Sequence, residues 1–255
     1  MNPESTAQRV NLSCDSSCPL TSEKRYRWYK NGQPFKNSQS IFVSSSENTD
    51  SYSCTVSFSL PSSSVCVSNS SCWGVTYTSR RVCALVGSTV NIHSSYSHPT
   101  GYTVKKTYWD YSRYGAFSDL RDVQFSGRVE FVGNTLRIKD VNTSDSGEYY
   151  FRFITNTSKE VSGYPGVFLI VTGTRVRSSP DPVIDGEKVI LSCSTECPLD
   201  NKHTYIWYKN GQQVTDGLTL LNKLYLDSIN SEELQEYSCT VRGNTTSHHT
   251  SDQII

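Results

Sequence analysis

Apolar and polar side chains alternate along several short segments of the chain, with the period of two that is typical of half-buried β-strands. The clearest segment is 149–153, Tyr-Tyr-Phe-Arg-Phe, in which three aromatic residues share one face while Tyr150 and Arg152 share the other. The pattern therefore predicts an all-β protein in which Arg152 stands on the outer face of a sheet. Further strands are predicted at residues 90–92, 105–109, 127–131, 135–138 and 167–171.

A long repeat occurs near the two ends of the chain. Residues 10–33 match residues 189–212, and each residue of the second copy is numbered 179 higher than its counterpart. Each copy has a cysteine, a tryptophan 14 residues later and, further on, Tyr-Ser-Cys. This order is typical of strands B, C and F of an immunoglobulin sandwich, in which the tryptophan packs on an intersheet disulfide. The pattern predicts the disulfides Cys14–Cys54 and Cys193–Cys239.

The two copies are too far apart to be neighbours, because one immunoglobulin sandwich takes about 100 residues. A third unit must lie between them, and the length of chain between its strands at 105–109 and 135–138 favours the variable type. Arg128 and Asp145 stand where such domains form an ion pair. With only nine residues before Val10, the first unit should lack its A strand. We therefore expect tandem immunoglobulin-like β-sandwiches of C2-type, V-type and C2-type at residues 1–64, 65–173 and 174–255.

Composition and charge favour an extracellular protein. The 24 lysines and arginines balance the 24 acidic residues, which gives no reason to expect nucleic acid or an anionic membrane as partner. Nine cysteines indicate an oxidising compartment. Residues 1–6 do not form a signal peptide, and no run of 18 apolar residues is present to span a bilayer. We therefore expect a piece of a longer, single-pass receptor on the extracellular side of the plasma membrane. Glycosylation sequons stand at Asn11, Asn69, Asn142, Asn156 and Asn244.

Four segments of the middle unit carry a family resemblance. They are Trp73-Gly-Val75, Trp109-Asp-Tyr-Ser112, Gly127-Arg-Val-Glu130 and, most specific, Asp145-Ser-Gly-Glu-Tyr-Tyr-Phe-Arg-Phe153. On these segments the unit resembles the N-terminal V-type domain of the siglecs, the sialic-acid-binding immunoglobulin-like lectins. The whole chain is similar to the fish receptors described as similar to the B-cell inhibitory siglec, in which V-type domains alternate with Cys-x3-Cys domains.

The resemblance implies a sugar-binding site. In siglecs the arginine of this motif binds the carboxylate of sialic acid, and the resemblance implies this role for Arg152. An aromatic residue at the N-terminal end of the siglec domain packs on the sugar, and the resemblance implies this role for Trp73. The family's second aromatic residue is replaced by Val161, so Tyr164 is the nearby aromatic residue that would substitute. The implied partners are sialylated glycoproteins or glycolipids on cell surfaces. Affinity would be about millimolar, because one charge-assisted pair contributes about 1.5–3 kcal/mol. The alternative for Trp73 is a buried anchor between domains.

The resemblance also implies partners for the remaining cysteines. It implies a disulfide Cys83–Cys197 between the middle and last units. Cys18 is the repeat counterpart of Cys197, so its partner would lie in a domain upstream of this chain. Cys66 and Cys72 then remain to close a small loop.

The disulfide inside siglec V-type domains has no counterpart in this chain. The strand B position reads Ser94, and strand E begins at Asn134. Because such a crosslink typically contributes about 2–4 kcal/mol, we expect the middle unit to be the least stable of the three.

Two other classes of function compete with sugar binding. None of the five histidines lies in a hydrolase or metalloprotease motif, and the cysteine spacing fits no zinc site. We therefore expect no enzyme, metal or cofactor, and we interpret His248-His249 as a solvated tail. The stronger alternative is an adhesion or immune receptor whose V-type face binds a protein. Tyrosines that would suit such an interface are Tyr108, Tyr111, Tyr114 and Tyr150.

Overall fold

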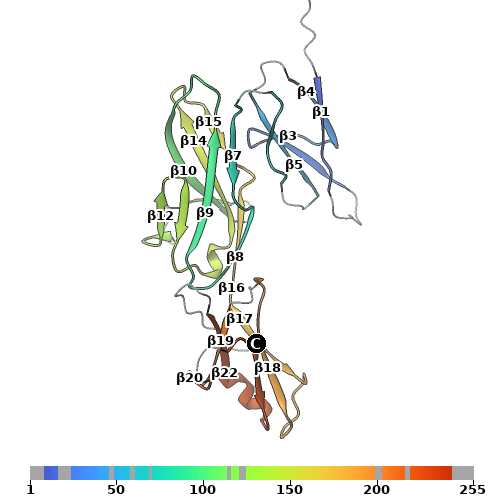
Figure 1. Cartoon of the computed structure of the whole chain (residues 1–255), viewed down its shortest axis with the longest axis vertical. Coiled ribbons are helices and arrows are strands. Elements are labelled where there is room, and N and C mark those ends of the chain that lie inside the picture. Colours follow the sequence, from blue (N-terminus) through green and yellow to red (C-terminus); the bar gives the residue numbers. More distant parts are fainter. Residues whose placement is uncertain are drawn as a thin grey trace, which may run out of the picture.

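The computed structural model describes residues 9–16, 24–45, 49–57, 61–68, 71–113, 116–120, 125–198, 203–215 and 219–242. These residues form three β-sandwiches, each with its own hydrophobic core. In Figure 1 the first unit lies beside the upper part of the middle unit, and the third unit continues below the middle unit. This architecture of tandem, all-β immunoglobulin-like sandwiches agrees with the predicted fold class.

The first unit encloses a core built on Trp28 and the Cys14–Cys54 disulfide. One sheet pairs β1 (Arg9–Ser13) with β4 (Ser40–Ser44), and the other has the order β3 (Gln33–Lys36), β2 (Tyr26–Lys30), β5 (Ser51–Val56) and β6 (Val65–Cys66). Since β6 pairs with β5, the expected boundary at residue 64 lies one strand too early. A disulfide between Cys66 and Cys72 closes the short loop before the middle unit. The place of the missing A strand, before residue 9, lies outside the described residues.

The middle unit has the strand order of a variable-type sandwich. One sheet has the order β11 (Ala116–Asp119), β10 (Val104–Arg113), β14 (Gly147–Thr155), β16 (Val167–Thr172) and β8 (Arg81–Leu85), with β15 (Glu160–Ser162) also paired to β14. The facing sheet has the order β12 (Val129–Val132), β13 (Thr135–Ile138), β9 (Val90–Ser97) and β7 (Gly74–Tyr77). The aromatic residues Tyr149, Phe151 and Phe153 are at most 1% exposed, as their alternation predicts.

Hydrophobic packing stands in place of an intersheet disulfide in the middle unit. Trp109 packs edge-on against Phe151 with ring centroids 5.4 Å apart, and Ile92 belongs to the same core. Where the siglec disulfide is missing, the Ser94 Oγ donates a hydrogen bond to the Asn134 carbonyl oxygen at 2.8 Å. This bond joins the two strands more weakly than a covalent link, because water competes for both groups in the unfolded chain.

A buried ion pair holds the turn before β14. Arg128 donates to both carboxylate oxygens of Asp145, at 2.7 and 2.9 Å, so the predicted pair is confirmed. Asp145 is fully buried at the end of the short 3-10 helix η2 (Thr143–Asp145), and the Tyr149 hydroxyl donates to its carbonyl oxygen at 2.7 Å. These bonds fix the direction in which β14 leaves the turn, and therefore the position of Arg152.

The third unit is joined to the middle unit over a short distance. Its sheets are β17 (Thr174–Ser179), β18 (Val189–Thr195) and β21 (Lys223–Leu226), facing β20 (Gln212–Gln213), β19 (Thr204–Lys209) and β22 (Tyr237–Arg242), with the 3-10 helix η3 (Ser231–Glu236) before β22. Its core contains Trp207 and the Cys193–Cys239 disulfide. Gly173 alone separates β16 from β17, Cys83 and Cys197 form the expected interdomain disulfide, and Leu85 of β8 packs in the core of the third unit.

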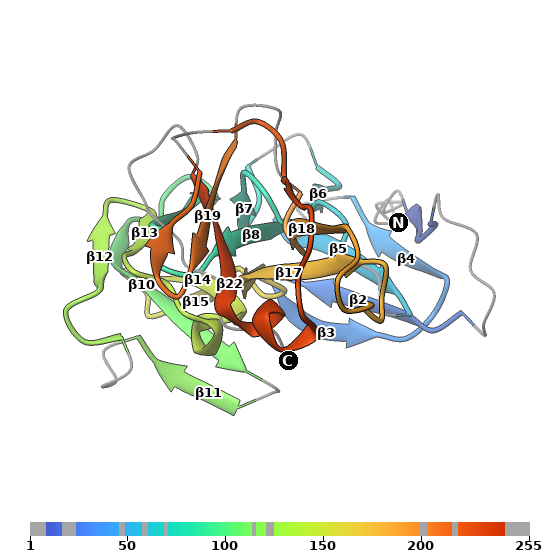
Figure 2. The same ribbon diagram turned by 90° about the horizontal axis from the view of Figure 1, so that it is seen from below.

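A close seam joins the first and middle units, which lie side by side when seen from below (Figure 2). Tyr29 of β2 packs edge-on against Tyr164 of the middle unit, with ring centroids 5.8 Å apart. Gly32, in the turn after β2, approaches so closely that a Cβ there would lie 2.0 Å from the carbonyl oxygen of Ser162. The Trp73 amide donates to the Thr49 carbonyl oxygen at 2.8 Å. The two units therefore contact each other through backbone as well as side chains.

Candidate functional site

Arg152 lies on the outer face of β14, as predicted. Its register partners are Tyr108 on β10 and Ser162 on β15. The side chain is 28% exposed, so the guanidinium is partly covered by its neighbours. The surroundings of this group decide what the face can bind.

Two carboxylates form ion pairs with the Arg152 guanidinium. The Arg152 Nε lies 2.7 Å from an Asp110 carboxylate oxygen, and the Nη1 donates to Glu160. In an antiparallel sheet, a long side chain can also reach the residue two positions away from its direct partner on the neighbouring strand. Asp110 lies two positions after Tyr108 on β10, and Glu160 lies two positions before Ser162 on β15. Arg152 is therefore paired in this structure, and a sugar carboxylate would have to compete with two acids for it.

Tyrosines complete the cluster around Arg152. The guanidinium carbon lies 5.9 and 5.5 Å from the ring centroids of Tyr108 and Tyr150. The Tyr108 hydroxyl donates to Glu160 at 2.9 Å. Burial by itself would lower the pKa of Arg152, but the hydrogen bond that it donates to Glu160 and the charge of Asp110 raise this pKa above its ordinary value. Burial raises the pKa of Glu160, and the hydrogen bonds from Tyr108 and Arg152 outweigh it, so the net pKa is lowered.

Trp73 belongs to the core and not to a sugar site. It is 1% exposed and packs against Tyr102 and Phe153, with ring centroids 4.7 and 6.3 Å away. The Lys159 ammonium lies 4.1 Å from the ring centroid. The prediction that Trp73 packs on a ligand is wrong, because the chain turns here into β7 and its side chain enters the sandwich. The alternative, a buried anchor beside the seam, matches this position.

Tyr164 points to the first unit. Its ring packs edge-on against Tyr29 and Tyr150, with centroids 5.8 Å away in both cases. Tyr150, expected at an exposed interface, is only 1% exposed beneath this packing, and Val161 is buried in the core at 1%. Tyr111, also expected at an interface, is 2% exposed because it points into the sandwich. Of the four candidate tyrosines, Tyr108 is partly exposed, and Tyr114 lies outside the described residues.

The predicted glycosylation sites differ in their surroundings. Asn11 and Asn156 are exposed, whereas the Asn142 side chain accepts a hydrogen bond from the Ser144 amide and caps η2. Glycosylation at these three positions stays a prediction. Sites and groups outside the described residues are Asn69, Asn244, Cys18, His248 and His249.

Sequence reasoning missed Asp110 and Glu160. Asp110 falls on the same face of its strand as Tyr108, so alternation already placed it outward. The pairing with Arg152 depends on how β10 and β15 are shifted along β14, and no residue pattern gives this register. A hydrophobic pattern constrains register only through the buried face.

The described residues contain no group of three or more His, Cys, Asp or Glu that could hold a metal ion. Within the same part of the chain, no helix is long and apolar enough to cross a membrane.

A comparison with protein families supports the fold of the third unit. A family model described as immunoglobulin domain matches residues 173–254, the third unit. Among solved structures, a Dscam structure concerned with isoform specificity has 17% identity and a TM-score of 0.31, over 90% of this chain and 64% of that chain. Drosophila OTK extracellular domains 3–5 have 17% identity and a TM-score of 0.32, over 98% of this chain and 91% of that chain. Sidekick-1 immunoglobulin domains 1–5 have 17% identity and a TM-score of 0.26, over 96% of this chain and 54% of that chain. TM-scores this low carry no argument about the fold or the ligands of this chain.

Proposed function

We propose that the chain is an ectodomain segment of an immunoglobulin-superfamily receptor that acts in cell adhesion or immune recognition on the extracellular side of the plasma membrane. The outer face of β10, β14 and β15 in the middle unit would bind a protein partner. The observation that carries this proposal is the Arg152 cluster, in which one guanidinium is already paired with both Asp110 and Glu160.

A paired cluster of this kind suits a protein interface. Arg152 does not require an anionic ligand, and the polar groups of the cluster can direct hydrogen bonds toward a complementary surface. Arginine and tyrosine are enriched at the energetic centres of protein interfaces, and Arg152 and Tyr108 stand opposite each other here. Lys105 and Lys106 are exposed at the edge of the face, where polar rims are usual.

The same cluster disfavours sialic acid. A sialic acid carboxylate would have to displace Glu160 from Arg152 while remaining close to the second carboxylate, Asp110. Like charges at short range repel, and the displaced Glu160 would lose its bonds to both Arg152 and Tyr108. Sugar recognition therefore ranks below protein binding as the function of this face.

The test uses multimers of the glycosylated chain, applied to cells that bind them. We expect binding to survive sialidase treatment of the cells and to be lost after mild protease treatment. Replacing Tyr108 by alanine should weaken binding about tenfold or more, since residues at interface centres contribute at least about 1–2 kcal/mol. Arg175→Ala, at an exposed arginine in the third unit, is the matched control and should bind normally. Loss of binding after sialidase alone would overturn the proposal in favour of a lectin.

A further inference from the structure

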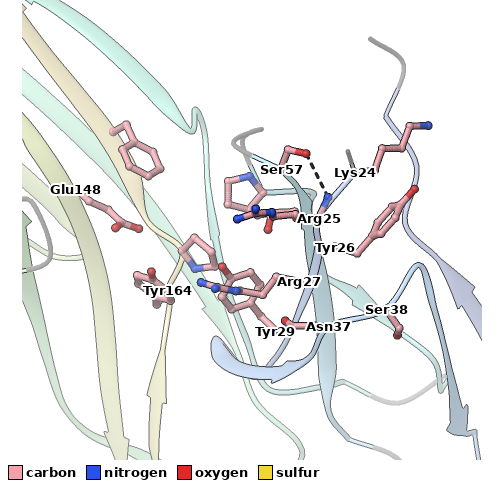
Figure 3. Close-up of a pocket in the computed structure, with 14 residues that line it drawn as sticks. Lys24, Arg25, Tyr26, Arg27, Tyr29, Asn37, Ser38, Ser57, Glu148 and Tyr164 are labelled. Atoms are coloured by element: carbon pink, nitrogen blue, oxygen red, sulfur yellow. Dashed lines mark hydrogen bonds between the residues drawn. The ribbon is translucent and has the colours of Figure 1, made fainter. Parts of the chain in front are cut away.

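A cleft of about 750 Å³ opens between the first and middle units. One wall is formed by β2 and the residues before it, and the other by Glu148, Tyr164, Pro165 and Phe168 of the middle unit (Figure 3). The contact between Tyr29 and Tyr164, which both line the cleft, and the close approach of Gly32 to Ser162 hold its walls together. It is separate from the face around Arg152, since Arg152 does not line it.

Three cations from the first unit line the cleft. Figure 3 shows the Arg25 and Arg27 guanidinium groups pointing across it toward the side of Tyr164, with Lys24 at the outer rim. Within the described part of the chain, no acidic side chain forms an ion pair with any of the three. The acid in the lining, Glu148, accepts a hydrogen bond from the Gly166 amide at 2.7 Å, and burial raises its pKa. The cleft is therefore positively charged on one wall.

The repeat shows that the fold does not need these cations. The residues at the same positions of the third unit are His203, Thr204 and Ile206, in and beside the strand β19 that corresponds to β2. Both units form the same sandwich with the same tryptophan and disulfide. The positive charge is thus an added property of the first unit, and it lies on the wall of the cleft that faces the middle unit.

The rest of the lining combines hydrogen-bonding groups with flat apolar surfaces. Asn37, Ser38 and Ser57 offer amide and hydroxyl groups, and Tyr164, Pro165 and Phe168 offer apolar surfaces. Sugar rings use both kinds of surface, through hydroxyl hydrogen bonds and through contact of C–H groups with aromatic faces. Guanidinium groups bind sulfate or carboxylate oxygens in bidentate geometry. We propose that the cleft binds an acidic, sulfated glycan chain through Arg25 and Arg27.

The experiment measures retention of the whole chain on immobilised heparin, together with competition by soluble heparin and by desulfated heparin. The test variant carries Arg25→Thr and Arg27→Ile, the residues that the third unit has at these positions. Each change should weaken binding about tenfold to a hundredfold, as expected for a lost charged hydrogen bond. A second variant with Arg25→Gln and Arg27→Gln serves if the first one fails to fold by circular dichroism.

The matched control removes the same number of exposed positive charges elsewhere, with Arg175→Thr and Arg177→Thr in β17. The proposal requires normal retention of this control and loss of retention by the cleft variants. It also requires that desulfated heparin compete at least tenfold less well than heparin. Equal weakening of the control and cleft variants would show unspecific charge attraction and overturn the proposal. Unchanged binding of the cleft variants, or binding of a polyglutamate peptide but not heparin, would also overturn it.

Discussion

Gly32→Ala tests whether the first and middle units are in contact through their backbones. Gly32 has φ of +76°, and its repeat counterpart Gly211 has φ of +74° in the same Lys-Asn-Gly turn. An added Cβ therefore strains both turns to the same extent, by about 1–2 kcal/mol. The two sites differ in what the new methyl group would contact: nothing lies within 4 Å of Gly211, whereas the Ser162 carbonyl oxygen lies 2.0 Å away from Gly32.

The size of the clash predicts the structural effect. A Cβ essentially never approaches another atom to less than 3.0 Å, so the backbones must separate by at least 1.0 Å. Ser162 belongs to β15, which is paired to β14, so it cannot yield without breaking the sheet. We expect the seam to open instead, which would expose Tyr29 and stretch the bond from the Trp73 amide to Thr49.

Hydrogen exchange followed by mass spectrometry or NMR measures this opening. The Trp73 amide should exchange at least tenfold faster in Gly32→Ala than in the natural chain, and small-angle scattering should show a wider arrangement. Gly211→Ala should lose a similar amount of stability within its own unit and leave Trp73 exchange unchanged. If both variants behaved alike at Trp73, the close approach at the seam would be refuted.

Further predictions concern the middle unit. Asp145→Asn leaves Arg128 without its buried partner, so the unit should lose about 3 kcal/mol in denaturant unfolding, while Glu196→Gln, at an exposed pair, should change stability by less than about 0.5 kcal/mol. Trp73→Ala should cost about 3–5 kcal/mol in the same assay, and a smaller loss would contradict its place in the core. In a thermal scan the middle unit, which lacks an internal disulfide, should unfold first; unfolding last would contradict this. The lowered pKa of Glu160 means that its bonds to Arg152 persist at pH 5 and are lost only as pH falls below the ordinary carboxyl range near 4.5, which NMR titration of Glu160 would follow.

Much of the fold could be predicted because its determinants are local. The strand at 135–138 and the inward faces of Tyr149, Phe151 and Phe153 follow from alternation, and the repeat indicates the outer two sandwiches. The disulfides among the described residues join the expected pairs. In each case the sequence pattern reflects the physical cause directly. A strand buried on one face has apolar residues at every second position, and the core of an immunoglobulin sandwich is built on an intersheet disulfide and a tryptophan.

The candidate site could not be predicted in the same way, because it depends on relations between distant segments. Arg152 points outward as its strand requires, but its ion pairs depend on the register of two other strands. Tyr150 also points outward, and it is buried because Tyr164 packs over it beside a second domain. A family resemblance transfers the identity of a residue and not the neighbours that surround it, which explains why Trp73 and Arg152 differ from expectation.

The single residue between β16 and β17, together with the Cys83–Cys197 bond, has a mechanical consequence. Tension applied at the last unit reaches the middle unit through two covalent connections, the backbone at Gly173 and the disulfide, so these two sandwiches should move as one rigid body. A ligand bound to the middle unit would therefore stay at a constant distance from the far end of the third unit.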